Sequence, residues 1–142
     1  MSIKEKEMRY REAVRYLDNA AEILRNKALK KDRYYGDAKY VSMACGTAYK
    51  AVLLALETYF ELKGMPLDHK KYGRTNVKDF ERRLAVLDKK MLNEFSTTYD
   101  VLHLAGYYEG QTKYDVIRSG MDSAIQIINK IKPMGMARLK LT

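Results

Sequence analysis

With 142 residues, 46% of them hydrophobic and 32% charged, the chain is long enough to bury a core and too apolar to be disordered. Its single cysteine, Cys45, excludes an internal disulfide and fits a reducing compartment. No stretch reaches the roughly 20 apolar residues of a membrane span, and the N-terminus MSIKEKEMRYRE does not resemble a signal peptide. We therefore expect a cytoplasmic protein with a single helical domain over residues 1–142, an ordered core over about 4–132 and a C-terminal tail over 133–142.

The formal charge of +9 is of the kind that attracts nucleic acids, acidic proteins and anionic membrane surfaces. The basic residues are scattered along the chain, however, and form no single tract. Within the first predicted helix, charges of both signs recur at helical spacing, at Arg11, Arg15, Asp18, Glu22 and Arg25. This pattern favours a solvated, salt-bridged surface over a dedicated polyanion site.

The first half of the chain predicts two long helices. The first runs from about residue 4 to about 31, on an apolar stripe made of Tyr10, Ala13, Leu17, Ala20, Leu24 and Ala28. Gly36 breaks this pattern, and the second helix follows over about 37–63. Because its apolar face is much wider, we expect the second helix to contact several neighbours as the central element of the core.

Gly64 and Pro66 predict the end of the second helix and a loop over 64–76. Thr75 or Asn76 can then cap a third helix. Its inward stripe consists of Val77, Phe80, Leu84 and Leu87, and the next stripe, Leu92, Phe95, Tyr99, Leu102 and Gly106, is slipped by one residue. We favour a break near Asp88, which can cap a new helix, although a curved continuous helix is the alternative.

After Gly110 the last predicted helix carries an apolar stripe and ends before Pro133. That stripe is Tyr114, Ile117, Met121, Ala124, Ile128 and Ile131. No strand-like alternation is evident, and the connections are short, so neighbouring helices should be antiparallel. The predicted fold is all-α, an up-and-down four-helix bundle with one additional short helix.

Few residues could carry chemistry. The chain has two histidines, His69 and His103, and lacks the Cys and His spacings of metal sites as well as a glycine-rich phosphate loop. We therefore predict neither a metal nor a cofactor. Cys45 lies on the apolar stripe of the second helix, where we expect a buried small hydrophobe, and His69 is expected to be a capping or surface residue.

His103 is the residue most open to a functional interpretation. It lies four residues from both Tyr99 and Tyr107 and five before Tyr108, so that an imidazole and several phenols share one side of a helix. Such a group could bind a phosphate or transfer a proton. The plainer interpretation, a histidine at the edge of a helical core, is favoured. The candidate binding residues are His103, Tyr107, Tyr108 and Arg74.

Four segments together resemble the HEPN superfamily of helical bundles. They are AxxACGTAYKAVLLALETYFELKG, the PLDH loop, VKDFERRL and YDVLHLAGYYEG before a last helix, and the resemblance covers about residues 10–132. Many members of that superfamily are metal-independent ribonucleases, with an arginine and a histidine about five positions apart that meet across a dimer. The corresponding positions here are His103 and Tyr108, which implies that the arginine is missing and that a phenol stands at the acid–base position.

Two functions follow from this resemblance. The first is a non-catalytic homodimer that serves as a binding or accessory protein for a protein, RNA or nucleotide partner. The second is a metal-independent ribonuclease of toxin type that uses His103 and Tyr108, with an arginine from elsewhere such as Arg74 or Arg118 to hold the phosphate. A purely structural protein is a third possibility. We favour the non-catalytic protein, because a shared fold does not by itself transfer chemistry.

Overall fold

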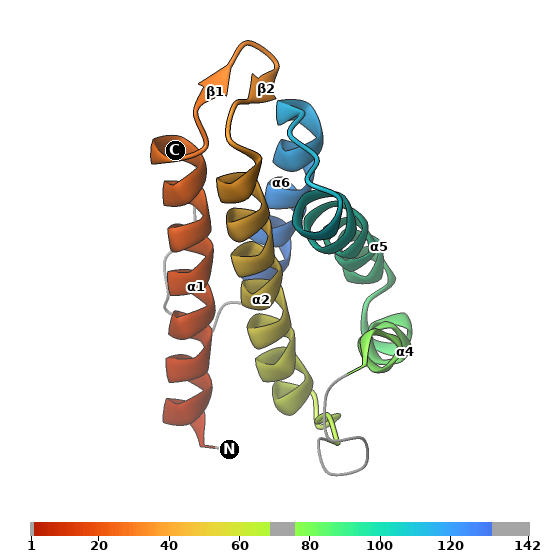
Figure 1. Cartoon of the computed structure of the whole chain (residues 1–142). Helices are drawn as coiled ribbons and strands as arrows, with labels where there is room; N and C mark the ends of the chain where they lie inside the picture. The colour runs from red at the N-terminus through yellow and green to blue at the C-terminus, as the bar shows by residue number, and fades with distance from the viewer. Residues whose placement is uncertain (1, 69–75, 132–142) are drawn as a thin grey trace.

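The structure is a helical bundle with a small hairpin at one end (Figure 1). The computed structural model describes residues 2–68 and 76–131. Its elements are α1 (Ile3–Asn26), β1 (Lys30–Lys31), β2 (Tyr34–Tyr35), α2 (Ala38–Leu62), α4 (Val77–Leu87), α5 (Lys89–Thr98), the π-helix η1 (Tyr99–Tyr108) and α6 (Tyr114–Ile131). Helices α5 and η1 form one rod. The described part of the chain therefore has four main rods, which alternate in direction along the sequence: α1, α2, α5–η1 and α6. Helix α4 is the additional short helix. The predicted fold class is confirmed.

The core is built around α2, as its wide apolar face predicts. This helix buries 11 of its residues and packs against α1, η1 and α6. The stripe predicted for α1 is also buried, with Tyr10, Ala13, Leu17, Ala20 and Leu24 as its members. The Tyr10 hydroxyl donates to the carbonyl of Ile128 over 2.8 Å, which ties α1 to α6 without leaving a buried phenol unpaired.

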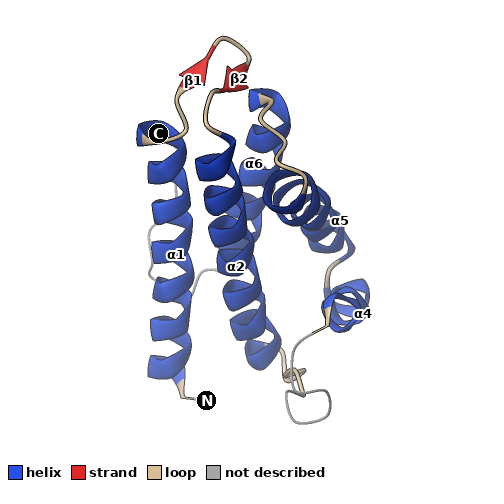
Figure 2. Ribbon diagram, in the orientation of Figure 1, coloured by secondary structure: helices blue, strands red, loops and turns tan. Residues whose placement is uncertain are grey.

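The predicted extension of the first helix to about residue 31 is wrong. Helix α1 ends at Asn26, and the next residues form a hairpin in which Lys30 pairs with Tyr35 and Lys31 with Tyr34. Figure 2 shows these two strands beyond the ends of the helices. The chain turns there because Leu29 and Asp32 adopt positive φ angles of 56° and 57°, which right-handed helices do not contain.

The hairpin is held by backbone hydrogen bonds to the start of α6. The Tyr35 N–H donates to the carbonyl of Thr112 over 2.9 Å, and the Tyr114 N–H donates to the carbonyl of Arg33 over 2.8 Å. The Gly36 N–H closes the turn on the carbonyl of Leu29 at 2.9 Å. These tertiary bonds offset the unfavourable φ angles and fix the hairpin against α6.

The predicted break near Asp88 is confirmed. Asp88 has extended backbone between α4 and α5, and its Oδ1 accepts from the Met91 N–H over 3.0 Å as a helix cap. Its Oδ2 lies 2.6 Å from Lys130 Nζ, so the same carboxylate also joins the break to α6. The hydrogen bond from Lys130, followed by that from Met91, lowers the pKa of Asp88.

The end of α2 also follows the prediction. Gly64 has a φ of 71°, the Met65 N–H donates to the carbonyl of Phe60, and the Gly64 N–H donates to that of Glu61, which is a Schellman motif. The Arg83 side chain of α4 donates to the carbonyls of Met65 and Pro66 and so anchors α4 to this turn. Asn76 caps α4, whereas Thr75 and most of the predicted loop lie outside the described residues.

Adjacent residues of α2 provide a matched test of the packing. Leu56 is fully buried, whereas Glu57 forms a partly exposed ion pair with Arg9 over 3.3 Å. Leu56→Asp places an unpaired charge in the core and should cost several kcal/mol, while Glu57→Ala should cost less than about 1 kcal/mol. Thermal unfolding followed by circular dichroism measures both. Equal melting temperatures would contradict this assignment of the helix faces.

Candidate functional site

The segment that carries His103 is a π-helix, where the sequence predicts an α-helical stripe. Its hydrogen bonds reach five residues back, as in the bond from the Glu109 N–H to the carbonyl of Leu104 over 3.0 Å. This wider turn brings residues four and five apart to the same side. Tyr107 and Tyr108 therefore both lie next to His103. Short π-helical segments are frequent at functional sites, which makes η1 a reasonable place to examine.

Glycines allow η1 to pack very closely against its neighbours. A Cβ atom on Gly106 would lie 2.3 Å from the Sγ of Cys45 in α2, and one on Gly120 of α6 would lie 2.7 Å from Val101 Cγ1. Both distances are well inside van der Waals contact. The backbone of η1 is thereby set close to α2 and α6.

The side chains around His103 form what we call the aromatic cluster: His103, Tyr49, Tyr99, Tyr107 and Tyr108. The imidazole stacks on Tyr49 with the ring centroids 4.8 Å apart and lies 5.3 Å from Tyr99. Tyr107 is nearly parallel to it at 6.3 Å, and Tyr108 meets it edge-on at 5.1 Å. Such offset and edge-to-face arrangements are favourable between aromatic rings.

The aromatic cluster extends from the core to the surface. Tyr49 is buried, His103 is half-buried, and Tyr107 and Tyr108 are 47% and 69% exposed. The backbone beneath the exposed rings is held by the Ser42 hydroxyl, which donates to the carbonyl of Tyr107 over 2.8 Å. The cluster therefore combines a fixed inner part with two tyrosines available at the surface.

Burial sets the protonation state of the aromatic cluster. Desolvation lowers the pKa of His103 below its ordinary value of 6.5, so the imidazole is neutral at pH 7. Desolvation, the nearby Tyr99 phenol and Glu81 raise the pKa of Tyr49, whose phenol keeps its proton. A neutral imidazole among tyrosine rings offers hydrogen bonds and ring surface, but it supplies no positive charge to hold a phosphate.

The structure brings three of the four predicted binding residues together, namely His103, Tyr107 and Tyr108. The fourth, Arg74, and also His69, lie outside the described residues. Arg118, the other arginine considered for phosphate, instead pairs with Asp122 over 3.1 Å and lines a separate cavity. The sequence pattern did not indicate Tyr49, because this ring comes from α2.

Cys45 is buried, as predicted, and burial raises the pKa of its thiol to about 12. A thiol with so high a pKa is not a nucleophile at neutral pH. Its role in the structure is the contact with Gly106. Cys45 thus packs as the small hydrophobe that the sequence suggested.

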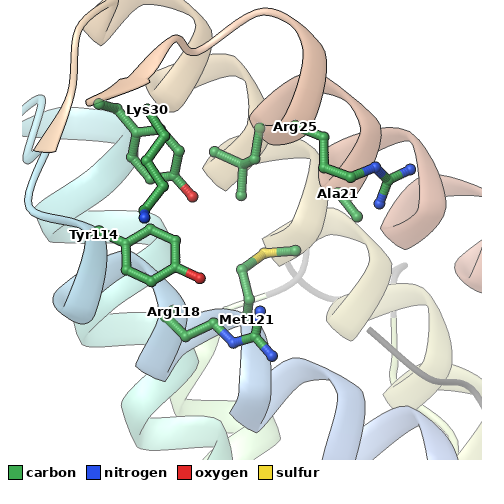
Figure 3. A pocket seen from close by; sticks show the side chains of 8 residues that line it. Ala21, Arg25, Lys30, Tyr114, Arg118 and Met121 are labelled. Carbon is green, nitrogen blue, oxygen red and sulfur yellow. The ribbon is translucent and has the colours of Figure 1, made fainter. Parts of the chain in front are cut away.

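A cavity beside the hairpin was not foreseen from the sequence. It has a volume of about 250 Å³ and is lined by Ala21, Leu24, Arg25, Lys30, Tyr35, Tyr114, Arg118 and Met121. We call it the hairpin cavity (Figure 3). In the sequence, Arg25, Lys30 and Arg118 are part of the scattered basic residues. Lys30 lies over Tyr114 of α6 because the chain turns at Leu29 and Asp32, and nothing in the sequence indicated this turn.

Two features of the described residues concern the requirements of a metal site and of a membrane-spanning helix. Within residues 2–68 and 76–131, no three His, Cys, Asp or Glu side chains are grouped so that they could hold a metal ion. In the same part of the chain, no helix combines the length and the apolar character that crossing a bilayer requires.

The fold and the aromatic cluster define the class: an all-α up-and-down bundle whose third rod ends in a π-helix. The family model described as "Domain of unknown function (DUF5618)" matches residues 8–133, and the chain belongs to this family. A solved structure, a protein of unknown function from Dyadobacter fermentans, is similar to it, with 41% identity and a TM-score of 0.79. The similarity covers 93% of this chain and 98% of that one. No curated protein matches the chain.

The lowered pKa of His103 predicts a specific pH dependence of stability. A histidine whose pKa is lower in the folded state contributes stability above about pH 6.5, and this contribution is lost as the pH falls through the folded pKa. From about pH 8 to about pH 5.5, the free energy of unfolding should therefore fall more for the parent protein than for His103→Phe. Phenylalanine keeps the ring contacts but does not titrate.

Urea unfolding at several pH values measures this difference. The second histidine, His69, is present in both proteins, so the comparison isolates His103. A pH dependence that is the same in the parent and in His103→Phe would show that His103 is not desolvated in the folded protein.

Proposed function

We propose that this chain is a non-catalytic binding protein of the cytoplasm that acts as a homodimer, and that its likeness to the HEPN superfamily is genuine. The observation that carries the proposal is the set of rings around His103. The imidazole lies against four tyrosine rings, so the position that would do acid–base chemistry is built into a packed aromatic surface.

The arrangement of arginines supports the same choice. Cleavage of RNA without a metal requires a cation at the phosphate as well as an acid and a base. Arg118 lines the hairpin cavity, which includes neither His103 nor Tyr108, so it does not lie with the residues that would act as acid and base. The ribonuclease alternative would therefore need a cation other than Arg118, such as Arg74 or a residue from a second copy of the chain.

The aromatic cluster also suggests how the homodimer forms. Tyr107 and Tyr108 are exposed neighbours whose rings meet edge to face at 5.2 Å. Tyrosines are enriched at protein interfaces, and a two-fold dimer places the same patch of each protomer at its centre. We take a second copy of this chain as the occupant of this surface. A protein, RNA or nucleotide partner would then bind to the dimer.

Light scattering tests the dimer. The parent should show about twice the protomer mass of 16.5 kDa at micromolar concentration, and Tyr108→Lys should shift the mass toward a single protomer. Tyr34→Lys, on the hairpin, is the matched control, because Tyr34 is also an exposed tyrosine. A mass of 16.5 kDa for the parent at all concentrations would remove the proposal of a homodimer.

A nuclease assay separates the two functions. Purified protein should leave mixed RNA intact in the presence of a chelator, although its charge of +9 can give weak, salt-sensitive binding. Metal-independent cleavage that His103→Ala reduces by roughly 10²–10⁴-fold, as expected for loss of an acid or base, would establish the ribonuclease instead. Cleavage that is unchanged in His103→Ala would come from another site or from a contaminant.

A further inference from the structure

The hairpin cavity lies where three parts of the chain meet. Helix α1 contributes Arg25, the hairpin contributes Lys30 and Tyr35, and α6 contributes Tyr114 and Arg118. At about 250 Å³, the cavity lies just below the range of about 300–1,000 Å³ that is common for ligand pockets. Its occupant must therefore be a small molecule or one group of a larger one.

The lining is strongly cationic. Three of its eight residues are basic, and none of the eight is acidic. Lys30 Nζ lies 4.3 Å from the centroid of the Tyr114 ring, and Figure 3 shows the Tyr114 hydroxyl pointing toward Arg118 and Met121. An excess of positive charge around a concave surface attracts small anions, and it does so more strongly for a doubly charged group.

The ion pair of Arg118 with Asp122 does not prevent this side chain from binding an anion. Both partners are about half exposed, at 42% and 50% of their side-chain surface, and exposed ion pairs contribute only about 0–1 kcal/mol. The contact is made through Nε. A guanidinium has five N–H donors in a planar fork, which matches the oxygens of a phosphate.

The phenols of the hairpin cavity are fixed in place. The Tyr35 and Tyr114 rings lie 5.7 Å apart, and backbone hydrogen bonds to Thr112 and Arg33 hold the two residues. Burial, with smaller effects from Tyr114 and Cys45, raises the pKa of Tyr35 to about 12 and outweighs the opposing effect of Arg118. Tyr35 therefore keeps its hydroxyl proton at neutral pH.

The remaining wall is apolar and consists of Ala21, Leu24 and Met121. A bare inorganic anion would leave this wall and the two phenol rings without a partner. A ligand that combines a phosphate with a small apolar or aromatic group would meet both the basic side chains and this wall. Neither His103 nor Tyr108 lines the hairpin cavity, so this site is separate from the aromatic cluster.

We propose that the hairpin cavity binds a small phosphate monoester that carries an apolar or aromatic group. Arg118 and Lys30 hold the phosphate, and Tyr35 and Tyr114 face the attached group. A phosphate monoester is favoured over a carboxylate because it bears up to two negative charges against the three basic residues of the lining.

Isothermal titration calorimetry with phenyl phosphate tests this site, with inorganic phosphate and benzoate as companion probes. Phenyl phosphate should bind most tightly, because inorganic phosphate lacks the ring and benzoate lacks the second charge. Lys30→Gln with Arg118→Gln should weaken binding by about tenfold or more, as expected when charge-assisted hydrogen bonds are lost. The matched control, Arg11→Gln with Arg15→Gln, removes the same charge from exposed positions of α1 and should leave the affinity unchanged.

Three results would overturn the proposal: no heat of binding for phenyl phosphate, equal weakening by the two double variants, or benzoate binding as tightly as phenyl phosphate. Circular dichroism melts show whether each variant is folded. If a variant is unfolded, the site is tested instead by the amide chemical shifts of the parent protein. Phenyl phosphate should change the shifts of the hairpin and of the start of α6. Light scattering tests the homodimer separately. A negative result for the phosphate monoester therefore leaves the proposal of a homodimer unaffected.

Discussion

The rest of the structure depends on the close approach of η1 to α2 and α6. At Gly106 there is no room for a Cβ beside the Cys45 sulfur, and at Gly120 there is none beside the Val101 side chain. Because interiors are packed as densely as organic crystals, such contacts set the spacing of the backbones and tolerate little change. With η1 set in this way, the His103 ring stacks on Tyr49 of α2, and the rings of Tyr107 and Tyr108 lie next to His103.

The same packing connects the aromatic cluster with the hairpin cavity. Gly110, with a φ of 69°, follows η1 and turns the chain toward α6, and the Gln111 N–H donates back to the carbonyl of Ala105 over 2.9 Å. The next residues pair with the hairpin and position Tyr114 beneath Lys30. The segment from Gly110 to Tyr114 therefore supports both surfaces. They differ in chemistry, because aromatic rings make up the aromatic cluster and three basic side chains line the hairpin cavity.

Sequence reasoning succeeded where the signal is local. The stripe of α1, the wide face of α2, the cap at Asp88 and the turn at Gly64 all follow from helical periodicity or from the chemistry of helix ends. It failed where distant contacts decide. The positive φ angles of Leu29 and Asp32 are stabilised by tertiary hydrogen bonds, and two-residue strands show no alternation. The apolar stripe of η1 does not distinguish a π-helix from an α-helix. Tyr49 and the hairpin cavity come from contacts between separate elements, so they had no sequence signature.

A double-mutant cycle between Gly106 and Cys45 tests the central contact most directly. Alanine is the better helix former by about 1 kcal/mol, so Gly106→Ala would stabilise a helix that had space for the methyl group. The close contact predicts the opposite, a loss of about 1–3 kcal/mol from the free energy of unfolding. In a Cys45→Gly background, which removes the sulfur, the same substitution should cost at least about 1 kcal/mol less. Additive costs, or a Gly106→Ala variant as stable as the parent, would contradict the account.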